Sequence, residues 1–136
     1  MATIDIKIEG SLLIASVTGN LTANEVIAVI NKYYPTGTIR DVIWDLTNGT
    51  MQSISMEGFA AIAKTSKETS ANRARQRGKT VFVTSNTTEH NMFCKYTALA
   101  EVAGAVVEFN VFKTVDGAIN WINGYFVSQA KKTEKT

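Results

Sequence analysis

The stretch from residue 40 to residue 63 constrains the fold more than any other feature, because its hydrophobic period changes halfway. The segment from Val42 to Leu46 is apolar apart from Asp45, which is typical of a strand covered on both faces. Residues that favour turns follow directly: Thr47, Asn48 and Gly49. Beyond Ser55 the apolar residues lie three and four positions apart, as on one face of a helix: Met56, Phe59, Ala60, Ile62 and Ala63. The pattern predicts a buried central strand, a polar loop that ends the strand, and a packed helix.

Length and composition bound the domain organisation. A chain of 136 residues is expected to form one domain, and it is long enough to bury a substantial core. Hydrophobic residues make up 45% and charged residues 19%, which is ordinary globular usage and excludes wholesale disorder. We assign residues 1–127 to a single domain, and residues 128–136, in a lysine- and threonine-rich stretch, to a frayed tail.

Charge and cysteine content bound the partners and the compartment. The formal net charge of +2 is too small to indicate a polyanion, so no nucleic-acid partner is expected. A single cysteine makes no internal disulfide, so nothing requires an oxidising compartment. The first nine residues lack a hydrophobic signal core, and the longest apolar runs are too short to cross a bilayer. We therefore expect a cytoplasmic protein without a membrane span.

Strand and helix signals alternate along the whole chain. Apolar and polar residues alternate over residues 4–9, and a turn at Gly10 leads to a second apolar stretch over residues 12–17, which predicts a hairpin. Thr22 and Glu25 match the capping box that starts a helix. Later signals predict strands over residues 81–83 and 106–112, and helices that begin at Ser55, Asn86 and Thr114. The order β-β-α-β-α-β-α-β-α indicates an α/β fold with a mixed, mostly parallel sheet.

Several segments resemble the STAS domain, the fold of bacterial anti-sigma factor antagonists. Residues 42–59 are similar to its apolar strand, short loop and helix start, and residues 78–83 are similar to its next strand. Residues 96–104 and 111–122 resemble its last third, and stand-alone STAS-like proteins have also been compared with lipid-transfer CRAL-TRIO domains. The resemblance implies a STAS-like fold and a non-enzymatic regulatory or protein-interaction module. The alternative that it implies is a carrier of a small apolar or lipid-like ligand.

The sequence departs from the STAS pattern at the start of the helix after the central strand. Aligning Gly58 with the glycine of the family places Ser55 at the family's aspartate, Met56 at its phosphorylated serine and Glu57 at its second serine. Methionine has no hydroxyl group, so the usual phosphorylation does not run at that position. Glu57 would supply a permanent negative charge there, while Ser53 and Ser55 remain alternative phosphorylation sites or plain helix caps.

Residues with catalytic chemistry are few. His90 and Cys94 lie four positions apart and share a helical face, but a zinc site needs four ligands and a thiol catalyst needs a third orienting group. Asp41, Asp45 and Glu57 would do acid–base chemistry only if they converged near the central crossing. The sequence contains no glycine-rich phosphate loop. We expect no enzymatic activity, no metal and no cofactor.

Positive charge gathers between residues 64 and 79, in Lys64, Lys67, Arg73, Arg75, Arg77 and Lys79. An anionic partner would be attracted to such a cluster. No aromatic residues are interleaved to stack bases, which argues against nucleic acid. A solvated helix end explains the same charges, and cations also suit the negative pole of the helix.

The carboxyl ends of the two central parallel strands are the best candidate site. Ligands of open α/β sheets bind there, and both predicted strands end in small polar residues. With the start of the following helix, the candidate binding residues are Asp45, Thr47, Asn48, Ser53, Ser55, Glu57, Ser85, Asn86 and Thr87. Ordinary capping and turn chemistry explains the same residues, so both interpretations stay open.

Aromatic residues supply a further hypothesis about partners. The expected core aromatics are Phe59, Phe93, Tyr96, Phe109, Phe112 and Trp121. Trp121 falls off the inner stripe of the last helix, and Tyr125 and Phe126 follow it. A partly exposed apolar edge there would favour a homodimer. The expected partner is another protein, with a second copy of the chain and a small apolar ligand as the alternatives.

Overall fold

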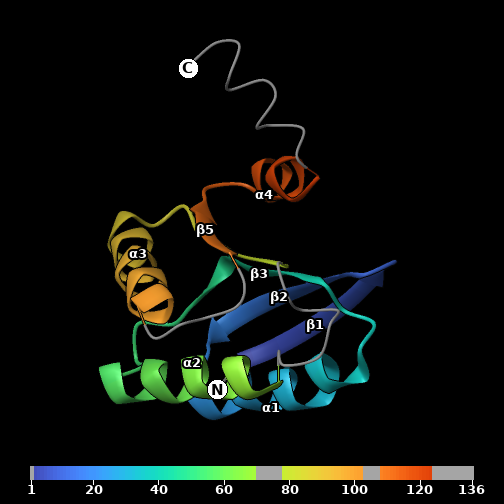
Figure 1. Ribbon diagram of the computed structural model, residues 1–136. Helices are drawn as coiled ribbons and strands as arrows, with labels where there is room; N and C mark the ends of the chain where they lie inside the picture. Colours follow the sequence, from blue (N-terminus) through green and yellow to red (C-terminus); the bar gives the residue numbers. More distant parts are fainter. Residues whose placement is uncertain (1, 70–77, 103–107, 124–136) are drawn as a thin grey trace.

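A five-stranded mixed sheet forms the centre of the computed structural model, which describes residues 2–69, 78–102 and 108–123 (Figure 1). The strands follow the order β1-β2-β3-β4-β5; β1 is antiparallel to β2 and the other neighbours are parallel. The elements are β1 (Ala2–Glu9), β2 (Leu12–Asn20), α1 (Ala23–Tyr33), a short 3-10 helix (Tyr34–Thr36), β3 (Asp41–Thr50), α2 (Met56–Thr69), β4 (Lys79–Val83), α3 (Thr87–Val102), β5 (Glu108–Phe112) and α4 (Val115–Ile122). The predicted α/β class and element order are confirmed.

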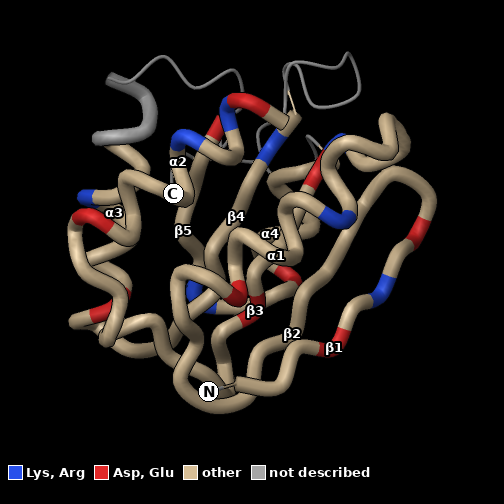
Figure 2. Tube along the Cα trace, turned by 90° about the horizontal axis from the view of Figure 1, so that it is seen from below, with Lys and Arg blue, Asp and Glu red and all other residues tan. Residues whose placement is uncertain are grey.

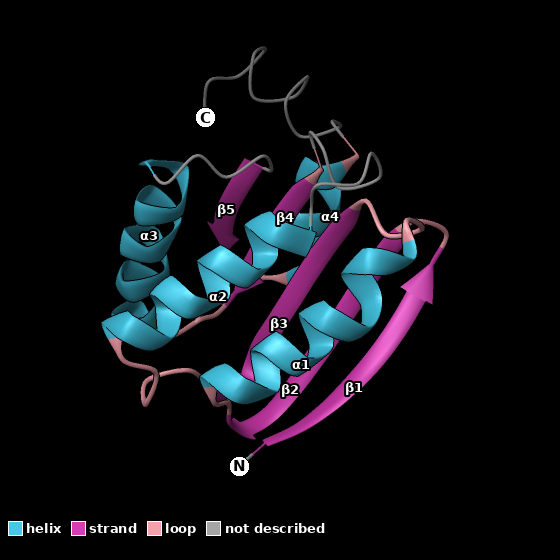
Figure 3. Cartoon of the chain, turned by 60° about the horizontal axis from the view of Figure 1, so that its bottom comes forward, coloured by secondary structure: helices cyan, strands magenta, loops and turns pink. Residues whose placement is uncertain are grey.

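The sheet is covered on both faces, which is why its central strands are apolar throughout. Helices α1, α2 and α3 pack on one face and α4 packs on the other (Figures 1 and 3). In β3, Val42 and Trp44 belong to the larger core, while Ile43 between them belongs to the smaller core under α4. Fully burying an aliphatic side chain of this size stabilises the fold by roughly 1.5–3 kcal/mol. The predicted position of residues 42–46 in the middle of the sheet is confirmed.

Local capping sets the start of α1. The side chain of Thr22 accepts a hydrogen bond from the N–H of Glu25, and the Glu25 carboxylate accepts one from the N–H of Thr22, so the predicted capping box is present. The same carboxylate accepts a hydrogen bond of 3.1 Å from the N–H of Ala2, which ties β1 to α1. These hydrogen bonds lower the pKa of Glu25 below its ordinary value, and the one from the Thr22 backbone has the largest effect.

The predicted turn at residues 47–49 is wrong, because β3 continues to Thr50. Asn48 and Gly49 pair with Thr18 and Gly19 of β2, after a register shift that places two residues of β3 opposite Val17. A β-bulge of this kind kinks a strand without ending it. A Cβ atom on Gly49 would lie 2.8 Å from both Cγ1 and O of Val17, so glycine is required by the close approach of β2 and is not a turn signal here.

The predicted inner face of α2 is partly wrong. Phe59 and Ile62 are buried as expected, and Ser66 continues the same row. Met56 is 63% exposed and Ala60 is also exposed. At 100° per residue, these two residues lie on the stripe next to the buried row. The apolar face of α2 is therefore wider than the core requires, and the excess width points to solvent.

The predicted aromatic core is present in the described residues. Phe82 stacks on Phe93 with ring centroids 4.7 Å apart, and Tyr96 lies 5.0 Å from Phe59 and 5.6 Å from Phe82. Burial raises the pKa of the Tyr96 hydroxyl well above its ordinary value. Phe109 is partly buried against this cluster. The cluster joins α2 and α3 to the β4–β5 side of the sheet.

Candidate functional site

The loop between β3 and α2, residues 51–55, is held at several points. The N–H of Met51 donates a 2.7 Å hydrogen bond to the buried carboxylate of Glu89 on α3, and the N–H of Ile54 donates to the carbonyl of Met51. The Ser53 hydroxyl donates to the side-chain oxygen of Asn20 at the end of β2. These contacts connect the loop to β2 and to α3, so it presents the start of α2 in one position.

The start of α2 carries an exposed apolar side chain between polar ones. Ser55 caps the helix as predicted, since its hydroxyl accepts a 3.1 Å hydrogen bond from the N–H of Gly58. Glu57 is exposed in the first turn, where the helix dipole favours an acid. Met56 lies between these residues with 63% of its surface exposed. The candidate residues Ser53, Ser55 and Glu57 thus flank, in the chain, an apolar side chain that was expected in the core.

Other candidate residues serve the local backbone at the carboxyl ends of β3 and β4. Asp45 Oδ1 accepts hydrogen bonds from the N–H (3.0 Å) and the hydroxyl (2.6 Å) of Thr47, at the bulge of β3. Asn86 caps α3 by accepting a 2.9 Å hydrogen bond from the N–H of Glu89. These three contacts are ordinary turn and capping chemistry. Asn48, Ser85 and Thr87 are exposed.

The carboxyl ends of β3 and β4 are adjacent, but β3 extends further than β4. Strands β3 and β4 are neighbours, as the prediction required, and β4 ends at Val83 opposite Asp45. Strand β3 then continues for five residues beside β2. Thr47 and Asn48 therefore lie in a strand and not in a loop that faces Ser85.

The three acids considered for acid–base chemistry do not converge. Asp41 begins β3, is buried and accepts a 2.9 Å hydrogen bond from the N–H of Lys79. Asp45 is four residues further along the same strand, or about 13 Å at the usual rise. Glu57 lies in the first turn of α2, beyond the end of that strand. Within the described residues, no group of three or more His, Cys, Asp and Glu side chains could hold a metal ion.

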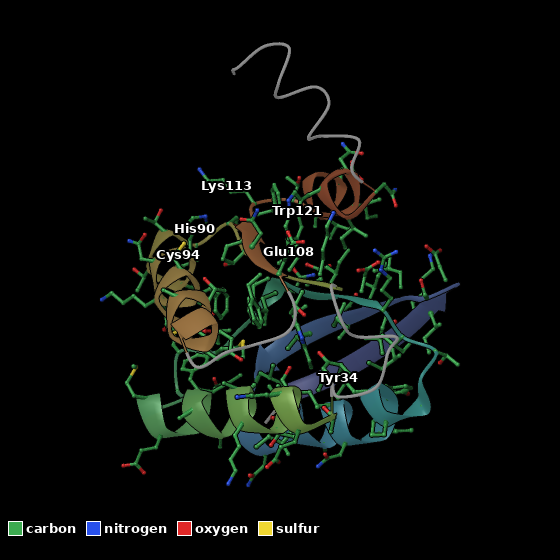
Figure 4. All side chains as sticks on the ribbon, viewed as in Figure 1. Tyr34, His90, Cys94, Glu108, Lys113 and Trp121 are labelled. Atoms are coloured by element: carbon green, nitrogen blue, oxygen red, sulfur yellow. The ribbon has the colours of Figure 1, made fainter. Side chains whose placement is uncertain are left out.

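His90 and Cys94 do share one face of α3. Cys94 Sγ lies 3.8 Å from His90 Nδ1, and the thiol is exposed (Figure 4). Two ligands do not complete a zinc site, and a thiol catalyst also needs an orienting group. The pair therefore supplies a surface contact and no site.

An open groove between α2 and α3 was not predicted. Its volume is about 450 Å³ and its lining is mostly apolar; the lining residues are Met56, Phe59, Ala60, Ala63, Lys64, Lys67 and Tyr96. By contrast, the space among α1, α2, α3 and the sheet measures only about 10 Å³, at the lower limit for a single water molecule. The sequence indicates this groove only through Met56 and Ala60, which make the apolar face of α2 wider than the core requires and which were predicted to be buried.

The predicted basic cluster is divided in the structure. Lys64 and Lys67 line the groove beside α2. Lys79 instead turns toward α4, where its Nζ donates to the carbonyl of Trp121 at 3.0 Å and lies 5.0 Å from the ring of the same residue. Arg73, Arg75 and Arg77 lie outside the described residues. Lys79 therefore stabilises the end of a helix and does not extend a surface for an anion.

Trp121 is partly buried. Its ring lies 6.1 Å from that of Phe112, and both side chains pack against the smaller core under α4. Tyr125, Phe126 and the predicted tail at 128–136 lie outside the described residues.

Solved structures with the same fold cover 90% of the chain. An anti-sigma factor antagonist from Mycobacterium paratuberculosis matches with a TM-score of 0.60 and 15% identity over 95% of its own length. An uncharacterized protein with a SpoIIAA-like fold from Shewanella loihica matches at 0.58 and 16% over 95% of its length. The anti-sigma factor antagonist SpoIIAA in its unphosphorylated form matches at 0.51 and 13% over 99%. The predicted STAS-like fold is confirmed.

Sequence comparison adds no further assignment, since no protein-family model and no curated protein matches the chain. Among the described helices, none has the length and apolar character to cross a membrane.

Proposed function

We propose that this chain is a non-enzymatic, cytoplasmic regulatory module that binds another protein through the start of α2. The observation that carries the proposal is Met56, a large apolar side chain that is 63% exposed in the first turn of α2. Met56 is continuous with the mostly apolar groove lined by Phe59, Ala60 and Ala63, and a contiguous exposed apolar patch is typical of a protein-binding surface. The fold shared with anti-sigma factor antagonists supports a regulatory role.

The surroundings of Met56 suit a contact surface. The loop before it is held by Glu89 and Asn20, so little conformational entropy is lost when a partner binds. The exposed polar candidates Ser53, Ser55 and Glu57 lie within three positions of it in the chain, and four further candidates are exposed elsewhere: Asn48, Ser85, Asn86 and Thr87. The apolar groove beside α2 begins at Met56 and offers room for a side chain of the partner. The partner would anchor on Met56 and make polar contacts around it.

Charge at the helix start would set the regulatory state. The resemblance places Met56 at the position of the phosphorylated serine, so we propose that Glu57 provides a permanent negative charge in place of a switchable one. In this proposal the module binds its partner without a phosphorylation cycle at that position. Ser53 and Ser55 have exposed hydroxyl groups and remain the alternative sites of modification.

A photo-crosslinking amino acid at position 56 tests the proposal in the full chain within the source cell. We expect it to capture one predominant protein, which the same label at Asn120, an exposed residue of α4 on the opposite face, does not capture. With that protein purified, Met56→Ala should weaken binding about tenfold, as for a central interface residue. Glu57→Ala should weaken it also, whereas Asp116→Ala on α4 should not.

One result would overturn the proposed contact surface, and another would overturn only the proposed role of Glu57. Equal capture from positions 56 and 120 would mean that the start of α2 is not a specific contact. Binding that is unchanged by Glu57→Ala but reduced by Met56→Ala would keep the surface and remove the role of the permanent charge.

A second candidate function is the carriage of a small apolar ligand, which the groove between α2 and α3 favours. Its volume of about 450 Å³ is within the range of small-molecule sites, and Lys64 and Lys67 suit an anionic head group. Native mass spectrometry of the protein purified from the source cell would detect such a ligand. Ala60→Trp should fill the groove and displace it, while Ala61→Trp, on an exposed position outside the lining, should not.

A further inference from the structure

Strand β1 forms an open edge of the sheet. It pairs with β2 along its whole length, from Ala2 opposite Gly19 to Glu9 opposite Leu12, and the strand order ends there. The other side of β1 lies at the margin of the molecule in the part of the chain that the structure describes (Figure 3). A strand of eight residues without proline or a bulge on an edge offers unpaired backbone groups to a further strand.

The face of β1 toward α1 is apolar and incompletely covered. Ile4 and Ile6 pack against the larger core, whereas Ile8 is 48% exposed. Beside them lies an open groove of about 390 Å³ between β1 and α1; its lining consists of Ile4, Ile6, Ala28, Val29, Lys32 and Tyr33. Among the described residues, Ile8 and Met56 are the exposed large hydrophobic side chains, and the proposed function uses only Met56.

The opposite face of β1 carries a row of exposed charges that alternate in sign. Asp5, Lys7 and Glu9 are all exposed, and Figure 2 shows acidic and basic residues alternating along β1. Lys7 Nζ lies 3.1 Å from the carboxylate of Glu9 within the same strand. Charges on an edge strand normally prevent association, but a row of mixed sign excludes only the registers that place like charges together.

We propose that β1 pairs with β1 of a second copy of this chain, antiparallel and centred on Ile6. This register places Asp5 of each copy opposite Lys7 of the other, so two opposite-charge pairs form across the twofold axis. On the other face, Ile6 meets Ile6 and Ile4 meets Ile8, which covers the exposed Ile8. The two sheets become one continuous sheet, with the α1 grooves adjoining at the axis.

The other registers are disfavoured by the same side chains. Centring the pair on Lys7 would oppose Lys7 to Lys7 and Asp5 to Glu9, which makes every charged pair repulsive. Centring it on Ile8 would restore attraction between Lys7 and Glu9 but would leave only the end of the strand paired. A shift by one residue would place the charged face of one copy beside the apolar face of the other.

A charge-swap experiment on the full chain tests this pairing by sedimentation. Wild type should dimerise, and Lys7→Glu or Asp5→Lys alone should raise the dimer dissociation constant about tenfold, since each turns both pairs repulsive. An equimolar mixture of the two variants should form a heterodimer, because every opposed pair is attractive again. Glu9→Gln, the matched control, should dimerise like wild type, because Glu9 faces the neutral Thr3 in this register.

Cross-linking tests the centre of the register independently of charge. In a Cys94→Ser background, Ile6→Cys should form an intermolecular disulfide, since facing Cα atoms are about 4.5–5.5 Å apart. Ile8→Cys should not cross-link. Preferential cross-linking at position 8 would overturn the register, as would dimers that weaken with Glu9→Gln. If the wild type stays monomeric at roughly 1 mM protein, the proposed dimer is wrong. The same conclusion holds if β1 is found to bind an extended peptide of another protein in place of a second copy.

Discussion

The carboxylate of Glu89 on α3 accepts a 2.7 Å hydrogen bond from the backbone N–H of Met51, a residue 38 positions earlier in the chain. Glu89 is 3% exposed, so this contact lies inside the protein. It holds the loop that leads from β3 into α2, and therefore the position of Met56. The proposed binding surface depends on a side chain that is not itself part of the surface.

Glu89→Ala should destabilise the fold by about 1–3 kcal/mol, because it leaves the buried N–H of Met51 without an acceptor. Urea unfolding measures the loss. Glu89→Gln is the matched control: its side-chain oxygen still accepts the hydrogen bond, so the loss should be smaller. Equal losses for the two variants would show that the hydrogen bond is not the stabilising feature.

Glu25 should make stability depend on pH. Its hydrogen bonds from Thr22 and Ala2 lower its pKa in the folded state, so its contribution is fully present above its ordinary pKa of 4.5 and is lost as the pH falls through the lower folded value. Glu25→Ala should cost about 1 kcal/mol at neutral pH, as for the loss of a helix cap. Urea unfolding of Glu25→Gln across the acidic range is the control, since the advantage of wild type over this variant should shrink below pH 4.5.

Lys79 should hold α4 against the sheet. Lys79→Met removes the contact of Nζ with the Trp121 ring and its hydrogen bonds to the carbonyls of Trp121 and Ile122, which together stabilise α4 by about 1 kcal/mol. Amide hydrogen exchange should become faster in α4 and stay unchanged in α1. Lys113→Met, which alters an exposed lysine just before α4, should leave the exchange unchanged. Faster exchange in both variants would point to net charge and not to the contact.

Gly49→Ala should be disruptive although alanine is small. The added Cβ would lie 2.8 Å from the carbonyl oxygen of Val17, so β2 and β3 would have to move apart, at a cost of roughly 1–3 kcal/mol. Asn48→Ala, at the exposed neighbouring position, should change stability by less than about 0.5 kcal/mol. Thermal unfolding of the two variants compares the sites directly, and similar melting temperatures would contradict the close approach.

Local features of the fold were readable from the sequence. The capping residues Thr22, Ser55, Asn86 and Thr114 were all predicted, and each makes its hydrogen bond to an N–H three residues ahead. A contact of this kind depends on a few neighbouring residues, so their identities determine it. The apolar run at residues 42–46 likewise required cover on both faces of the sheet.

The tertiary structure alone decided the remaining features, because they join residues that are distant in the chain. Pairing with Gly19 of β2 keeps Gly49 in a strand that its neighbours in the sequence would end. On α2 the core takes up only the row of Phe59 and Ile62, which leaves Met56 in solvent. Glu89 follows Asn86 by three residues, the spacing of a local capping pair, but its carboxylate binds Met51. Lys79 belongs to the predicted basic cluster but binds the end of α4. The sequence shows which side chains are apolar or charged, but which surface each of them contacts follows only from how the elements pack.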